Sequence, residues 1–103
     1  MIKVVESKDF ETEVKEGVVV VDFYADWCGP CKMLAPVFQE LAGEMEASAK
    51  FIKIDVDKTQ DVAMKFQVAS IPTMIILKDG VEADRIVGFM PKQAIESKIK
   101  QYI

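Results

Sequence analysis

The sequence predicts an α/β fold in which a central mixed β-sheet carries helices on both faces. Strand-like and helix-like segments alternate along the chain in the order β-α-β-α-β-α-β-β-α, which favours parallel pairing between strands that helices connect. Asp79-Gly80, between the last two strands, is a strong hairpin signal and adds an antiparallel edge. With 103 residues, half of them apolar, we expect a single domain over residues 1–103.

The first elements follow from the pattern of apolar residues. Residues 2–5 are typical of a short strand, and Ser7 can cap a helix whose inward positions are Phe10 and Val14. Residues 18–24 are nearly all apolar and β-branched. Such a segment is typical of a strand buried on both faces.

From Cys31 onward the apolar spacing becomes helical, and Pro36 inside this helix should kink it. A third strand is predicted over residues 51–56. The helix positions that share one face are Cys31, Leu34, Ala35, Phe38, Leu41, Ala42 and Met45.

Two shorter helices and a hairpin complete the chain. Thr59 can cap one helix, residues 73–78 and 82–87 form the hairpin, and Pro91 opens the last helix. The inward positions of the two helices are Val62, Ala63 and Phe66 in one, and Ile95, Ile99 and Tyr102 in the other.

Composition argues against several classes of protein. Thirteen basic and seventeen acidic residues give a net charge of −4, and the basic residues form no cluster that could neutralise phosphates, so we expect no nucleic-acid partner. The longest apolar run is four valines, too short for a membrane span. The first residues show no signal-peptide pattern. We therefore expect a cytoplasmic protein, in which paired cysteines are more often catalytic or metal-binding than structural.

The only two cysteines are Cys28 and Cys31. If they formed a structural disulfide, closing so short a loop would add only about 2 kcal/mol to the free energy of unfolding. The bond would also not persist in a reducing compartment. A structural zinc site needs four ligands, and the chain has no histidine and no second cysteine pair.

Redox chemistry explains the pair better. Cys28 falls where a strand ends and a helix begins, so free backbone N–H groups and the helix dipole favour its thiolate. Gly29 keeps the turn open, and Pro30 is tolerated in the first helical turn. Cys31 lies one turn further on the apolar face, so we expect an exposed attacking thiol and a buried resolving thiol, the arrangement that thiol–disulfide exchange requires.

Four segments in register resemble the thioredoxin family: residues 21–25, 27–32, 71–73 and 87–88. The resemblance implies a three-layer fold and reduction of protein disulfides through the Cys28/Cys31 dithiol. It also implies a thioredoxin reductase as electron donor, no cofactor besides the redox-active disulfide, and a monomer.

The resemblance gives Asp22 and Lys53 catalytic roles. On the sequence alone, Asp22 could be an acid that faces water at a strand end or a carboxyl buried beneath the cysteines, where burial would raise its pKa. The family has a buried aspartate there, which would take the proton from Cys31, with a lysine at the position of Lys53 close by.

The resemblance also predicts a flat, apolar substrate-binding surface. An Ile71-Pro72 bond has only about a 5–6% chance of being cis on general grounds, yet in the family this proline is cis and the residue before it binds the substrate backbone. The expected surface comprises Trp27, Gly29, Pro30, Ile71, Pro72 and Gly88, with Phe89 and Met90 at the rim. Two features depart from the family pattern: Tyr24 replaces a tryptophan, and the Phe89-Met90 rim is bulky.

Two alternatives stay open. One is a disulfide oxidant or isomerase, although Gly-Pro between the cysteines and the missing signal peptide argue against it. The other is a non-catalytic binding subunit in which the fold matters and the sulfurs do not.

Overall fold

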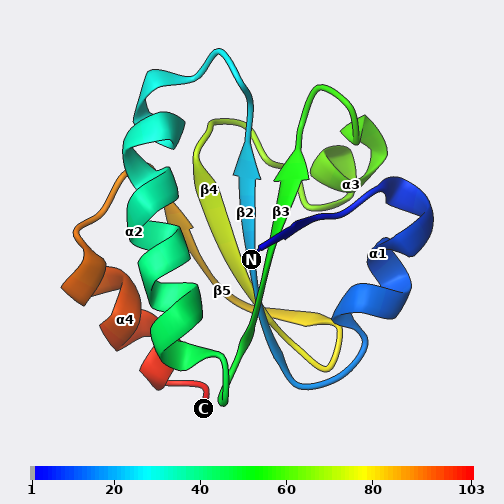
Figure 1. Cartoon of the computed structure of the whole chain (residues 1–103). Helices are drawn as coiled ribbons and strands as arrows, with labels where there is room; N and C mark the ends of the chain where they lie inside the picture. The colour runs from blue at the N-terminus through cyan, green and yellow to red at the C-terminus, as the bar shows by residue number, and fades with distance from the viewer. Residues whose placement is uncertain (1) are drawn as a thin grey trace.

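Five strands and four helices alternate along residues 2–103, the part of the chain that the computed structural model describes (Figure 1). Their order is the one predicted from the sequence. The elements are β1 (Lys3–Val4), α1 (Ser7–Val14), β2 (Val18–Tyr24), α2 (Gly29–Met45), β3 (Lys50–Asp55), α3 (Gln60–Lys65), β4 (Thr73–Lys78), β5 (Val81–Val87) and α4 (Lys92–Lys100).

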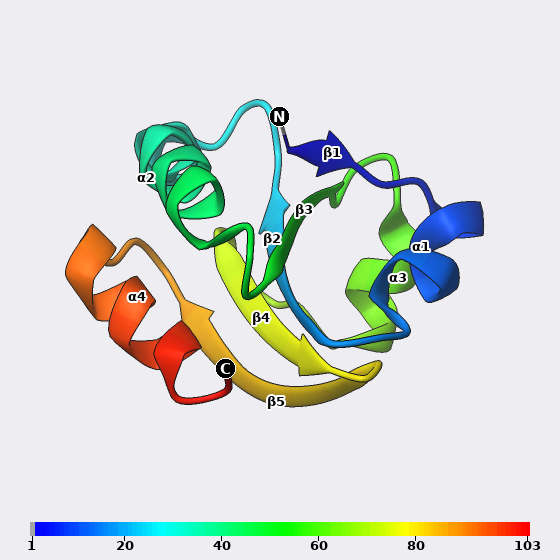
Figure 2. The ribbon, with the colours of Figure 1, turned by 60° about the horizontal axis from the view of Figure 1, so that its bottom comes forward.

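Strand β2 lies at the centre of a single mixed sheet with the strand order β1-β3-β2-β4-β5. It pairs in parallel with β3 and antiparallel with β4, while β1 runs parallel to β3 on the other side. The β4–β5 hairpin forms the antiparallel edge that the Asp79-Gly80 turn predicts (Figure 2). The central position of β2 explains its continuous apolar sequence.

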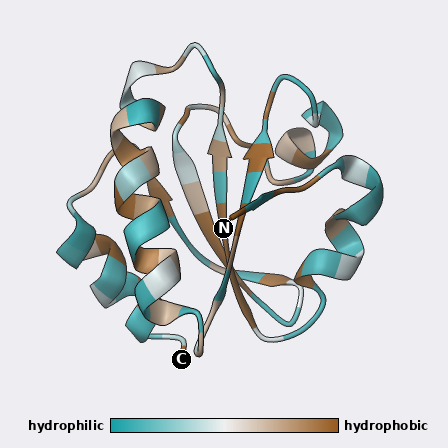
Figure 3. Ribbon diagram, viewed as in Figure 1, coloured by the Kyte–Doolittle hydropathy of each residue, from teal (hydrophilic) through white to brown (hydrophobic). Residues whose placement is uncertain are grey.

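Helices cover both faces of the sheet and make three layers. Helices α2 and α4 pack on one face, and α1 and α3 pack on the other (Figures 1 and 2). Because side chains alternate along a strand, Val20 joins the core under α2, whereas Val19, Val21 and Phe23 join the core under α1 and α3. Accordingly, the strands contain many hydrophobic residues, and hydrophobic residues recur at intervals along the helices (Figure 3).

The predicted helix caps are partly wrong. Helix α1 begins at Ser7 with Glu6 as its N-cap, and the Ser7 hydroxyl donates to Asp61 Oδ1 at 2.5 Å. Thr59 does hold the N-cap position of α3, but its side chain makes no capping hydrogen bond. Pro91 is the N-cap of α4 and precedes its first residue.

Within residues 2–103, none of the helices is long and apolar enough to cross a membrane.

Candidate active site at the carboxyl end of strand β2

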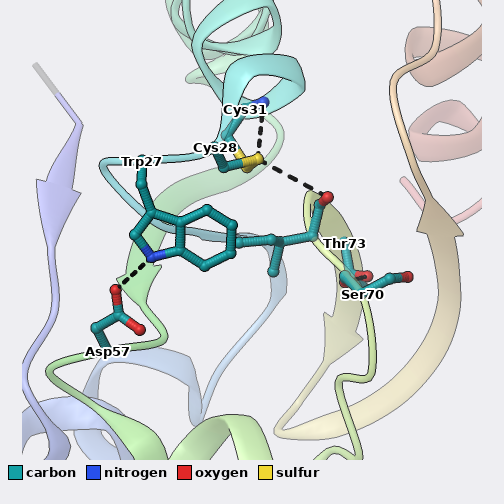
Figure 4. The surroundings of a disulfide bond; sticks show 7 residues. Trp27, Cys28, Cys31, Asp57, Ser70 and Thr73 are labelled. Carbon is teal, nitrogen blue, oxygen red and sulfur yellow. Dashed lines mark hydrogen bonds between the residues drawn. A yellow bond between two sulfur atoms is a disulfide. The ribbon is translucent and has the colours of Figure 1, made fainter.

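The two cysteines lie at the start of α2 and form a disulfide, with their Cα atoms 5.2 Å apart (Figure 4). Strand β2 ends at Tyr24, and a short loop places Cys28 at the N-cap of α2. The Cys31 backbone N–H donates to Cys28 Sγ at 3.2 Å. The sulfur of Cys28 therefore occupies the place that a capping oxygen takes at other helix starts.

Gly29 and Pro30 form the first turn of α2, and both are exposed. Pro30 has no N–H to leave unpaired there, which is why a proline fits. A Cβ added at Gly29 would find no heavy atom of another segment within 4 Å. In the free protein, Gly29 is thus not needed to relieve crowding from other segments.

One prediction about the cysteines is wrong: Cys28 is not the exposed member of the pair. Each cysteine residue is only 4% exposed, because the disulfide draws both sulfurs into a small cluster with Ala25, bordered by Tyr24 and Ile71. The asymmetry lies in hydrogen bonding. Only Cys28 Sγ receives the helix N–H bond, and a bond of this kind favours a thiolate.

The loop before β4 faces the disulfide. The Ile71-Pro72 peptide bond is cis, as the family resemblance predicts. The carbonyl oxygen of Ile71 lies 3.8 Å from Cys28 Sγ (Figure 4). Gly88, at φ +89°, donates its N–H to the Pro72 carbonyl at 2.8 Å and so places the start of the loop before α4 beside the same site.

Trp27 projects from the site, with 70% of its surface exposed, and is anchored at one edge. Its indole N–H donates to Asp57 Oδ2 at 2.8 Å (Figure 4). The buried Asp55 carboxylate holds that loop by accepting the N–H of Asp57 at 2.9 Å. Sequence reasoning missed Asp57. Its position just after a strand parallel to β2 was the available signal, because the carboxyl ends of parallel strands meet at one edge.

Asp22 is completely buried in β2, on the sheet face that α2 covers. Neither carboxyl oxygen has a hydrogen-bond partner. Burial raises the pKa of Asp22 to about 6, and the positive charge of Lys53 is a smaller effect that lowers it. The alternative that Asp22 faces water at a strand end is therefore excluded.

Lys53 is the neighbour of Asp22 in the parallel β2–β3 register. It is half-buried, and its ammonium lies 4.3 Å from the centre of the Tyr24 ring. The lysine therefore contacts the ring through its charge and makes no hydrogen bond to Asp22.

Comparison with known proteins agrees with this geometry. The thioredoxin family model matches residues 1–101. The chain belongs to the thioredoxin family. Among curated relatives, each named thioredoxin, the protein of Staphylococcus epidermidis is 46% identical and that of Staphylococcus saprophyticus 47%. The Staphylococcus aureus protein is 46% identical. Each alignment covers the whole of this chain and 98% of the relative.

Family membership and the Cys28–Cys31 pair together make the chain a thiol–disulfide oxidoreductase that reduces protein disulfides. This agrees with the prediction from the sequence. Nowhere in residues 2–103 do three or more cysteine, aspartate or glutamate side chains gather in a way that could hold a metal ion.

The exposed surface around the thioredoxin-family disulfide is smaller than predicted. Trp27, Pro30 and Phe89 are exposed, the last by 41%. Pro72 is buried beside the disulfide, and Met90 packs against the core beneath α2 and α4. The exposed members of the predicted surface are thus Trp27, Gly29, Pro30 and Phe89, while Ile71 and Gly88 are half-buried.

Proposed function

We propose that the chain reduces disulfides of cytoplasmic proteins, with Cys28 as attacking thiol and Cys31 as resolving thiol, and that a thioredoxin reductase restores its dithiol. The assignment of these two roles is supported by the hydrogen bond from the Cys31 N–H to Cys28 Sγ at the N-terminus of α2. That bond and the helix dipole both stabilise a thiolate on Cys28 and lower its pKa.

The reaction proceeds through one mixed disulfide. The Cys28 thiolate attacks one sulfur of the substrate disulfide, the substrate S–S bond breaks, and the departing thiolate takes up a proton. Cys31 then loses its proton and attacks Cys28 Sγ, which releases the second substrate sulfur as a thiolate, and this thiolate also takes up a proton. The substrate gains two electrons and two protons, and the chain is left with its Cys28–Cys31 disulfide. The sulfurs carry the electrons, so no bound cofactor takes part.

Asp22 serves as the proton acceptor for Cys31. A carboxyl with a pKa of about 6 is mostly ionised at neutral pH and still basic enough to take a proton. Its oxygens are free of other partners. A buried, unpartnered carboxylate is costly to the fold, which favours a role in the reaction over a structural role.

Substrates dock on the exposed surface that includes Trp27 and Phe89. An exposed surface with apolar side chains suits the segment around a disulfide in another protein better than it suits a small molecule. The main chain of Ile71 lies beside Cys28 Sγ and can pair with an extended substrate segment as an added strand does. Gly88 leaves room for that segment, since it carries no side chain.

A turbidity assay tests this proposal against a binding-subunit role. The chain and dithiothreitol are added to a disulfide-linked test protein whose separated chains precipitate. We expect turbidity to rise well before it does with dithiothreitol alone, and the Cys28→Ser/Cys31→Ser double variant should give no acceleration. Equal rates for the native protein and the double variant would show that the sulfurs are not used.

A further inference from the structure

The Lys53 ammonium lies over an aromatic ring and makes no hydrogen bond to the carboxyl of its strand neighbour, Asp22. Asp22 and Lys53 are register partners in β2 and β3, so their side chains leave the sheet on the same face. Tyr24 lies two residues beyond Asp22 on that face of β2. The Lys53 ammonium reaches the Tyr24 ring, at 4.3 Å, while both Asp22 oxygens have no hydrogen-bond partner.

This ring and ammonium border a cavity that leads to the resolving cysteine. The cavity has a volume of about 140 Å³, and its lining includes Tyr24, Lys53 and Cys31. Its other lining residues are Ala25, Asp26, Lys32 and Ala35. Cys31, Lys53 and Tyr24 thus line the same cavity.

We propose that Tyr24 is a positioning residue whose ring holds the Lys53 ammonium beside Asp22 and thereby sets how readily Asp22 takes the proton of Cys31. The inference rests on the proposed role of Asp22 as proton acceptor. Tyr24 itself touches neither the proton nor the substrate sulfur in this scheme.

The physical basis is the flexibility of lysine. An ammonium on a four-carbon stem moves into water unless a neighbour holds it. The face of an aromatic ring attracts the charge without neutralising it, so the positive field at Asp22 persists. A carboxylate in the same place would pair with Lys53 and cancel that field.

The charged groups that line the cavity are Lys53 from β3, Asp26 from the loop after β2 and Lys32 from α2, and Asp55 at the end of β3 also acts on Tyr24. The β4 neighbour of Asp22 is the apolar Met74. Burial first, and then the carboxylates of Asp55, Asp26 and Asp22, raise the pKa of Tyr24. The phenol therefore stays neutral at the pH at which Asp22 titrates, and only Lys53 brings a positive charge that acts on Asp22.

The test is a titration of the Asp22 carboxyl by carbon-13 NMR in the reduced full-length protein. Native protein is compared with Tyr24→Leu, Lys53→Met, the double variant, and Tyr24→Phe as the control that keeps the ring. At a fixed pH near 6, Tyr24→Leu should lower the ratio of ionised to protonated Asp22 by about two- to five-fold, the range set by one ring–ammonium contact. Lys53→Met should lower it at least as much, and Tyr24→Phe should match the native protein.

The double variant decides how the ring acts. If Tyr24 works through Lys53, adding Tyr24→Leu to Lys53→Met should change the ratio no further. A change in that background equal to the change in the native background would overturn the inference, since the ring would then act by its own bulk. An unchanged ratio in Tyr24→Leu would also overturn it. Should Tyr24→Leu not fold, Tyr24→Met takes its place in the same cycle.

The titration needs no turnover, so it separates this inference from the proposed function. A matching rate measurement follows the resolving step from pH 6 to 9 in the same variants. We expect Tyr24→Leu to shift the rise of that rate toward higher pH, as Lys53→Met does. A protein that titrates as expected but does not reduce disulfides would refute the proposed function and leave the Tyr24–Lys53 coupling intact.

Discussion

The indole N–H of Trp27 donates to Asp57 Oδ2 at 2.8 Å, across 30 positions of sequence. The large exposed ring beside the disulfide is therefore held by the loop that follows β3. Because the ring adjoins Cys28 and is the only indole in the chain, its fluorescence should differ between the oxidised and the reduced protein.

Asp57→Ala should reduce that redox difference in emission, because the freed indole no longer keeps one place beside the sulfurs. The hydrogen bond is exposed, so the free energy of unfolding should fall by about 1 kcal/mol or less. Asp61→Ala is the matched control, since Asp61 is also exposed and bonds Ser7 away from the site. Emission spectra of both redox states check this prediction. An undiminished difference in Asp57→Ala would mean that the bond does not fix the ring.

Asp22→Asn should stabilise the protein, and more so at higher pH. The folded protein holds the Asp22 proton up to a pKa of about 6, whereas the ordinary value is 3.8. Below pH 3.8 Asp22 is protonated in both the folded and the unfolded chain, so its ionisation does not change the free energy of unfolding. Between pH 3.8 and 6 only the unfolded chain releases the proton, so native stability falls, and above pH 6 the penalty is constant at about 3 kcal/mol.

Urea unfolding of native protein and Asp22→Asn from pH 4 to 8 measures this difference. The advantage of the variant should grow by up to about 3 kcal/mol and level off above pH 6. Asp9→Asn, an exposed change on α1, should show no such growth. A constant difference between Asp22→Asn and native protein across the range would show that Asp22 is not a buried titrating group.

The same variant should resolve mixed disulfides more slowly. General-base catalysis is typically worth about 10²–10⁴-fold, and we expect a smaller deficit here because water can partly replace the carboxylate. The deficit should be largest near neutral pH and shrink toward pH 9, where the thiol ionises unaided. Stopped-flow rates of the resolving step check it. A rate equal to the native rate throughout would leave Asp22 without a role in proton transfer.

Gly88→Ala should impair reduction of a protein disulfide more than reduction of a small disulfide. A Cβ at Gly88 would meet no atom within 4 Å, but φ is +89°, which an alanine adopts only with strain. We expect a loss of about 1–2 kcal/mol in the free energy of unfolding. Gly43→Ala, inside α2 with open space around it, should instead gain about 0.5–1 kcal/mol. Equal losses on both substrates would argue against a docking role for Gly88.

Where the sequence pattern is long and uniform, it predicted the structure well. The β-branched run gave β2 with the bounds Val18–Tyr24, and the helical spacing after Cys31 placed the buried face of α2 correctly. Helix starts were less predictable. Glu6, one residue before Ser7, holds the N-cap position of α1, and the bond from the Ser7 hydroxyl to Asp61 joins segments that only the packed structure brings together.

The functional site was likewise predicted only in part. Cys28, Cys31 and the cis Ile71-Pro72 bond followed from a short pattern and a family resemblance. The Trp27–Asp57 bond and the Tyr24–Lys53 contact did not, because each joins residues that meet only when β2 and β3 pair in one register. The equal burial of the two cysteines also escaped prediction, since it depends on the disulfide and on the residues packed around it.

The most direct test of the account is trapping with the single-cysteine variants. Cys31→Ser, mixed with a purified disulfide-linked protein, should accumulate a covalent mixed disulfide visible on a non-reducing gel, because no second thiol resolves it. Cys28→Ser should form almost none, and the double serine variant none at all. Accumulation with Cys28→Ser and not with Cys31→Ser would reverse the roles of the two cysteines and contradict the central claim.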